Sequence, residues 1–112
     1  MIITLPETRP VIEQLQAILE TGSRCAPRGL DPVLGCDCYG LIYWSFARAG
    51  IVLPPRVEEA EALFTIVSPP YQAWDLALFN FQPYQGARHL GLLLEPPSGY
   101  QLGKTTNGLS RF

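Results

Sequence analysis

Two residues of this sequence could act together as a nucleophile and a base. Cys38 lies at the start of one long apolar segment, and His89, the only histidine in the sequence, opens another, RHLGLLLE. A thiolate is a strong nucleophile, and an imidazole within hydrogen-bond reach can take the proton from a thiol. A cysteine followed at a distance by a histidine is the order that papain-like hydrolysis uses. We therefore treat Cys38 and His89 as a candidate thiol–imidazole pair.

The position of Cys38 favours this chemistry. The sequence predicts a helix from Asp37 or Cys38 to Ala49, ended by Gly50, with the apolar interior LIYWSFARA. Unpaired backbone N–H groups at the start of a helix favour a thiolate, and Asp37 can cap that end. The alternatives are an inert buried cysteine and a histidine with a purely structural role.

The three cysteines predict neither a disulfide framework nor a metal site. An odd number of cysteines with no export signal argues against disulfides. Cys36 and Cys38 are separated by one residue, whereas zinc sites space their thiols by about two to four and need four ligands. We expect no metal and no other cofactor.

The elements that must position the pair suggest an α+β fold. The sequence predicts a first helix capped by Thr8, with Pro10 in its first turn and Gly22 at its end. Its apolar stripe comprises Val11, Ile12, Leu15, Ile18 and Leu19. A short helix follows from Val57 to Phe64, and strand patterns come last, at 73–81, 88–94 and 100–106. Helices followed by strands predict helices packed on a small antiparallel sheet.

The bulk composition limits the possible classes of protein. A chain of 112 residues with 47% hydrophobic residues predicts one globular domain over residues 1–112. The net charge is −2 and no basic cluster occurs, which argues against binding to nucleic acid. We find no secretory signal and no apolar run of about 20 residues, so we expect no membrane insertion.

Three motifs give the sequence a resemblance to a known family. DCYGLIYWSFARAGIVLP resembles the Asp-Cys-Ser-Gly-Leu-Val motif of the NlpC-type cell-wall peptidases, with its helix ending in Ala-Gly-Ile-x-Leu-Pro. AWDLALF resembles the family's Gly-Asp-Leu-Val-Phe-Phe strand, and RHLGLLLE resembles its His-Val-Gly-Ile-Tyr-Leu strand. The resemblance extends from about Gly35 to Leu102 and implies a papain-like α+β fold.

The resemblance also implies roles for individual residues. Cys38 would be the nucleophile and His89 the general base, and the backbone N–H of Cys38 would help to hold the oxyanion. The third polar residue of the family lies on the next strand, here YQLGKTT, where Gln101 and Gly103 share one face. We expect Gln101, twelve positions after His89, to orient the imidazole; if Gly103 takes that place, the third member is missing.

For the residues on either side of the nucleophile, the resemblance implies contact with substrate. We therefore expect Asp37 and Tyr39 to belong to the substrate-binding site. Tyr39 replaces the small residue that usually follows the cysteine in this family.

The implied activity is that of a cysteine endopeptidase that degrades peptidoglycan. The family prefers the γ-D-glutamyl–diaminopimelate bond of the stem peptide. GCDCYGLIYWSF most resembles variants from phage tails, which implies a tail or baseplate hub component that the virion carries to the cell wall, with other tail proteins as partners. The alternatives are a virion tail protein that keeps the fold with weak or no catalysis, and an unrelated thiol-containing binding domain.

The apolar residues lead to two further expectations. Residues of the second helix should be buried against the strands; they are Leu41, Ile42, Phe46 and Ala49 on the helix, and Leu76, Leu78, Leu90 and Leu92 on the strands. Four aromatic residues near proline-rich segments either form a surface for partner chains or cover the small core: Tyr71, Trp74, Phe81 and Tyr84.

Overall fold

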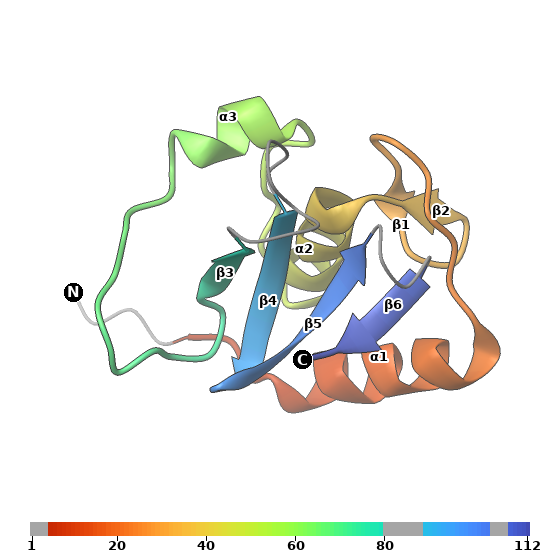
Figure 1. The fold of residues 1–112 in the computed structure, drawn as a ribbon, viewed down its shortest axis with the longest axis horizontal. Coiled ribbons are helices and arrows are strands. Elements are labelled where there is room, and N and C mark those ends of the chain that lie inside the picture. The colour runs from red at the N-terminus through yellow and green to blue at the C-terminus, as the bar shows by residue number, and fades with distance from the viewer. Residues whose placement is uncertain (1–4, 80–88, 104–107) are drawn as a thin grey trace.

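The structure, a computed structural model, describes residues 5–79, 89–103 and 108–112. Its helices are α1 (Arg9–Thr21), α2 (Cys38–Arg48) and α3 (Val57–Glu61). Its strands are β1 (Leu30–Asp31), β2 (Gly35–Cys36), β3 (Leu76–Phe79), β4 (His89–Glu95), β5 (Ser98–Gly103) and β6 (Gly108–Arg111). Strands β3 to β6 form an antiparallel sheet in sequence order, and β1 pairs with β2 (Figure 1). The predicted α+β architecture is confirmed.

Helix α1 follows the predicted pattern, and it packs near β6. Val11, Leu15 and Ile18 are buried on one face, and the helix ends at Gly22, whose φ of 111° lies in the region that favours glycine. One detail of the prediction is wrong. Thr8 occupies the N-cap position, but its backbone is already in the helical region and its side chain makes no capping hydrogen bond.

Helix α2 lies behind the sheet, where it contacts β4 and β5 (Figure 1). Leu41 and Ile42 are completely buried, as predicted, because they face the apolar side of β4. Phe46 and Ala49 are only half-buried. Leu78 is 62% exposed, which corrects the prediction, because it lies on the edge strand β3 beyond the part of the sheet that α2 covers.

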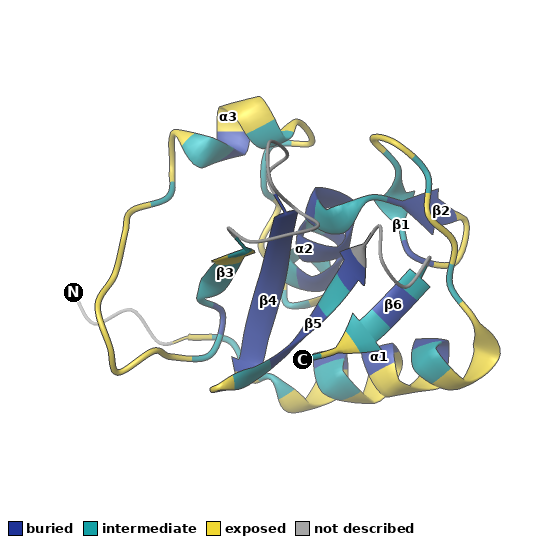
Figure 2. Ribbon diagram, viewed as in Figure 1, coloured by how far each residue is buried: buried dark blue, intermediate teal, exposed yellow. Residues whose placement is uncertain are grey.

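Strand β4 has two buried faces with different partners. Leu90, Leu92 and Leu94 belong to the core cluster that includes α2, and they alternate with His89 and Gly91 on the opposite face. The burial is plain in Figure 2, where β4 is dark blue over most of its length. The alternation explains how one apolar strand can both complete the core and carry a buried imidazole.

Some elements differ from the prediction. Helix α3 ends at Glu61, three residues before the predicted Phe64. The sequence predicted neither the pair β1–β2 nor strand β6. Of the strand prediction at 73–81, residues 80 and 81 lie outside the described part of the chain, and so do 104–106 of the last predicted strand.

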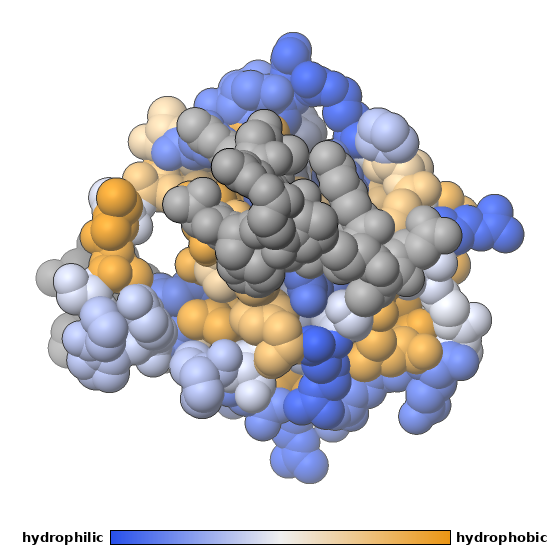
Figure 3. All heavy atoms as spheres, in the orientation of Figure 1, coloured by the Kyte–Doolittle hydropathy of each residue, from blue (hydrophilic) through white to orange (hydrophobic). Residues whose placement is uncertain are grey.

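The segment between α3 and β3 is largely exposed to solvent. Every residue from 65 to 72 is exposed, and Ile66 is fully so, at 103% (Figure 2). Apolar side chains here leave hydrophobic atoms on the surface at the left of Figure 3. Tyr71 is 49% exposed, but Trp74 is buried and its Nε1–H donates to the carbonyl of Pro6 at 2.8 Å, so Trp74 covers the core. Phe81 and Tyr84 lie outside the described residues.

Candidate active site

Cys38 is the first residue of α2, and its backbone is fixed by the residue before it. The Asp37 carboxylate caps the helix, because its Oδ1 accepts a hydrogen bond from Gly40 N–H at 2.8 Å. Asp37 has extended backbone geometry, with φ −99° and ψ −171°, as expected for an N-cap residue. The predicted start of the helix at Asp37 or Cys38 is confirmed, and Cys38 lies in its first turn.

A second set of contacts holds the start of α2 against the preceding loop. The other oxygen of Asp37 accepts a hydrogen bond from Arg28 N–H at 3.1 Å, and Arg28 has a φ of 59°, which is unusual for a residue other than glycine. A Cβ at position 40 would lie 2.0 Å from the Gly29 carbonyl oxygen, so only glycine fits there. The loop therefore packs directly against the first turn of α2.

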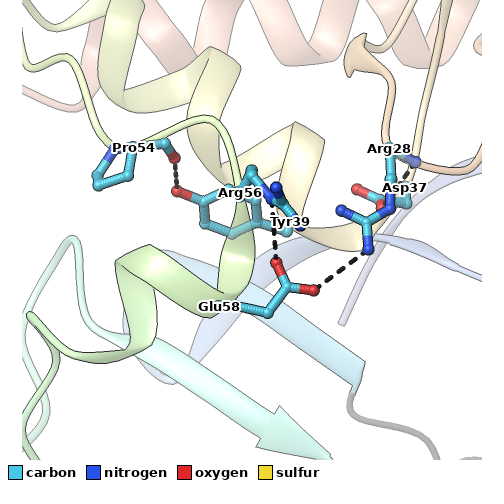
Figure 4. Close-up of polar contacts among 6 residues, drawn as sticks. All are labelled: Arg28, Asp37, Tyr39, Pro54, Arg56 and Glu58. Carbon is cyan, nitrogen blue, oxygen red and sulfur yellow. Dashed lines mark hydrogen bonds and ion pairs between the residues drawn. The ribbon is translucent and has the colours of Figure 1, made fainter.

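The same region carries a small exposed ion-pair cluster. Glu58 accepts from the Arg28 guanidinium at 3.3 Å and lies 3.9 Å from Arg56 Nε (Figure 4). The three side chains are more than half exposed, so these pairs stabilise the fold only slightly.

The electrostatic environment of Cys38 differs from the expectation that its pKa would be low. Burial raises the pKa of the Cys38 thiol, and the nearby Asp37 carboxylate raises it further. Hydrogen bonds from the backbone of Leu90, Tyr39 and Cys38 itself oppose these effects, but the net pKa shift is upward. Burial therefore disfavours the thiolate form of Cys38, and a neighbouring base would favour it.

The contact with Leu90 is informative because Leu90 directly follows His89 on β4. It places the Cys38 thiol against the backbone of the strand that carries the imidazole. This contact could not be predicted from the sequence, since it depends on how α2 lies on the sheet.

His89 is the first residue of β4 and is only 4% exposed. Its Nε2 lies 2.8 Å from Oε1 of Gln101 on the neighbouring strand β5. Because an amide oxygen can only accept, Nε2 carries the hydrogen and Nδ1 is the basic nitrogen. Of the two residues that share this face of the predicted strand, Gln101 is the one whose side chain reaches the imidazole.

The two residues expected to bind substrate have other surroundings. Tyr39 is 3% exposed and its hydroxyl donates to the carbonyl of Pro54 (Figure 4), so little of its side chain is accessible from solvent. Burial raises the pKa of the Tyr39 hydroxyl to about 12. Both oxygens of Asp37 accept backbone hydrogen bonds, so its observed contacts are structural. The sequence could not reveal this burial, because the first turn of a helix is usually open to solvent.

Comparison with known proteins shows the family of the chain. The family model described as the NlpC/P60 family matches residues 22–109. The chain belongs to the NlpC/P60 family. The match includes Cys38, His89 and Gln101, and it extends the resemblance seen in the sequence motifs toward the N-terminus.

Individual NlpC/P60 relatives are longer than this chain. The bifunctional muramidase/DL-endopeptidase CwlT of Bacillus subtilis is 38% identical over 80 residues, which cover 69% of this chain and 24% of CwlT. A lipoprotein-like NLP/P60 family protein of Staphylococcus aureus superposes with a TM-score of 0.64 at 27% identity, over 97% of this chain and 39% of the other. This chain thus spans about a quarter of CwlT and about two fifths of the Staphylococcus aureus protein.

A structure of the NlpC/p60 domain of the peptidoglycan hydrolase SagA has nearly the same extent. It superposes with a TM-score of 0.68 over 95% of this chain and 88% of the SagA domain, at 16% identity. At this identity the likeness shows the fold alone, and it agrees with the α+β architecture described above.

The described residues contain neither a metal-binding cluster nor a membrane-spanning helix. No group of three or more histidine, cysteine or acidic side chains could hold a metal ion among residues 5–79, 89–103 and 108–112. Within the same ranges, no helix combines the length and apolar character that crossing a bilayer requires.

Proposed function

We propose that this NlpC/P60 domain is a cysteine endopeptidase that hydrolyses peptide bonds in the stem peptides of peptidoglycan. The observation that carries the proposal is the 2.8 Å contact between His89 Nε2 and Gln101 Oε1. His89 lies on β4, and the Cys38 thiol lies against the backbone of the same strand. Family membership supports the same activity, and the relative CwlT is named as a DL-endopeptidase.

In the proposed mechanism the proton moves before the bond is cleaved. His89 Nδ1 takes the proton from the Cys38 thiol, whose pKa is raised by burial, and the thiolate attacks the carbonyl carbon of the scissile amide. The resulting oxyanion accepts a hydrogen bond from the backbone N–H of Cys38 at the start of α2. His89 then gives the proton to the leaving amine, and water hydrolyses the thioester with His89 again as the base.

Gln101 has an orienting role in this scheme. By accepting from Nε2–H, its amide oxygen keeps the imidazole in the tautomer whose Nδ1 can receive a proton. The proposal also specifies which peptide bond is cleaved. We expect cleavage between γ-D-glutamate and diaminopimelate, a bond that joins residues of D and L configuration, as the name DL-endopeptidase describes for CwlT.

The test is release of soluble muropeptides from purified peptidoglycan, followed by mass spectrometry of the products. The wild-type chain should free the amino group of diaminopimelate, and Cys38→Ala should abolish release. Cys25→Ala is the matched control, because Cys25 is exposed and lies outside α2. Release that survives Cys38→Ala would contradict the proposed nucleophile.

We further propose that the chain acts as part of a phage tail or baseplate hub. The resemblance of GCDCYGLIYWSF to tail variants supports this, and the exposed apolar side chains at 63–71 offer a surface that tail proteins could cover. Light scattering of the chain with and without neighbouring tail proteins tests the assembly. A chain that joins the tail but releases no muropeptides would instead be a virion structural protein.

A further inference from the structure

The imidazole of His89 has an aromatic neighbour that the proposed mechanism does not use. Phe79 is the cross-strand partner of His89 in the β3–β4 ladder. The two ring centroids are 5.2 Å apart and the planes are inclined by 42°. Because His89 is 4% exposed, the Phe79 ring restricts the space in which the imidazole can turn.

A second aromatic ring holds Phe79 in place. The Phe112 ring meets the Phe79 ring edge-on, with centroids 5.1 Å apart and planes at 83°. The backbone of Phe112 is fixed by two hydrogen bonds with Gly99, of 2.9 and 3.0 Å. Phe112 is therefore anchored to β5, the strand that carries Gln101.

Two glycines create the space for the Phe112 ring. A Cβ at position 91 would lie 2.6 Å from Phe112 Cε1, and a Cβ at position 99 would lie 2.7 Å from Phe112 Cζ. Gly91 follows His89 by two positions on β4, and Gly99 precedes Gln101 by two positions on β5, so all four residues lie on one face of the sheet. The hollow that Phe112 fills thus directly adjoins the candidate base and its hydrogen-bond partner.

We propose that Phe79, braced by Phe112, is a positioning residue for His89 in the proposed peptidase reaction. Gln101 holds the imidazole at Nε2, and a hydrogen bond at one atom does not by itself fix the tilt of a ring. Contact with Phe79 restricts this tilt, so that the two neighbours together fix the direction of Nδ1. The inference rests on the proposed function for its effect on catalysis, but its effect on the imidazole can be measured without substrate.

The experiment uses the fact that His89 is the only histidine in the sequence. After removal of any histidine tag, nitrogen–proton correlation spectra of the imidazole report the tautomer of this one ring. The variants are Phe79→Ala, Phe79→Leu and Phe112→Ala, each with its thermal midpoint measured to confirm folding. The matched control is Leu78→Ala at the residue before Phe79 on β3, which is 62% exposed, pairs with Leu90 and lies on the opposite face of the sheet from Phe79.

We expect the wild type and Leu78→Ala to show a single Nε2–H tautomer. The Phe79 variants should show averaging between tautomers and a kcat for muropeptide hydrolysis lower by about ten- to a hundredfold, with KM within about twofold, because misplacement of a catalytic group affects the chemical step. Phe79→Leu keeps an apolar side chain at the site, so it remains informative if Phe79→Ala fails to fold. Phe112→Ala should have the same effects to a smaller degree.

The inference is overturned if folded Phe79→Leu keeps the wild-type tautomer spectrum and a kcat within about twofold of wild type. It is also overturned if Leu78→Ala changes the spectrum as much as the Phe79 variants do. If the wild type hydrolyses no muropeptide, the proposed function fails, but the spectra still decide whether Phe79 and Phe112 hold the imidazole.

Discussion

Removing the Gln101 side chain tests whether the imidazole of His89 has to be oriented for activity. In Gln101→Ala, the Nε2–H of a histidine that is 4% exposed loses its acceptor at 2.8 Å. A hydrogen bond to a group that becomes charged in the reaction contributes about 1.5–3 kcal/mol. Since about 1.4 kcal/mol corresponds to a factor of ten in rate, kcat/KM should fall by about ten- to 150-fold.

The assay is the initial rate of muropeptide hydrolysis, with products separated by liquid chromatography. Gln101→Glu keeps an acceptor at nearly the same place, so it should lose less activity than Gln101→Ala. Gln16→Ala is the control, because Gln16 is exposed on α1. If Gln101→Ala keeps kcat/KM within about twofold of wild type, the reasoning is refuted, and His89 is oriented by other contacts.

Three further predictions follow from burial and charge. Leu41→Ala should lower the free energy of unfolding by about 2–5 kcal/mol in urea titrations, because Leu41 is completely buried; a loss below about 1 kcal/mol would mean looser packing. Asp37→Asn should speed the alkylation of Cys38 by iodoacetamide, because removing the negative charge lowers the thiol pKa and raises the thiolate fraction at a given pH. An unchanged or slower rate would contradict this role of the Asp37 charge. His89→Ala should slow the alkylation of Cys38 and leave the alkylation rate of the exposed Cys25 unchanged, as measured by peptide mapping. Equal slowing at both cysteines would exclude His89 as a specific base for Cys38.

Much of the site could be predicted because its parts have local signals. The apolar interior after Asp37 and the glycine at position 50 define the helix that carries Cys38, and two-residue alternation places Gln101 on a definite face of its strand. The choice between Gln101 and Gly103 needed the structure, because alternation gives the face but not which of two residues on it reaches the imidazole.

The rest depends on contacts between elements that are distant in the sequence. The upward pKa shift of Cys38 arises from burial under the sheet, which outweighs the effect of the helix N-terminus. Tyr39 can be buried because its hydroxyl donates a hydrogen bond to the carbonyl of Pro54, fifteen residues later. The pairing of Phe79 with His89 is a matter of strand register, which the strand patterns alone do not determine.

The exposed segment at 65–72 lies between the candidate site residues in the sequence: Cys38 precedes it, and His89 and Gln101 follow it. A protease with chymotrypsin-like preference can reach Tyr71, and exposed loops of this kind are the usual places of limited proteolysis. A cut there would leave Cys38 on one fragment and both His89 and Gln101 on the other, with α2 still packed on β4 and β5. The domain is therefore suited to fragment complementation: two separately produced halves, each inactive, would show the proposed hydrolysis only after reassembling the core. Fusing each half to one member of a binding pair would turn that reassembly into a reporter of the interaction.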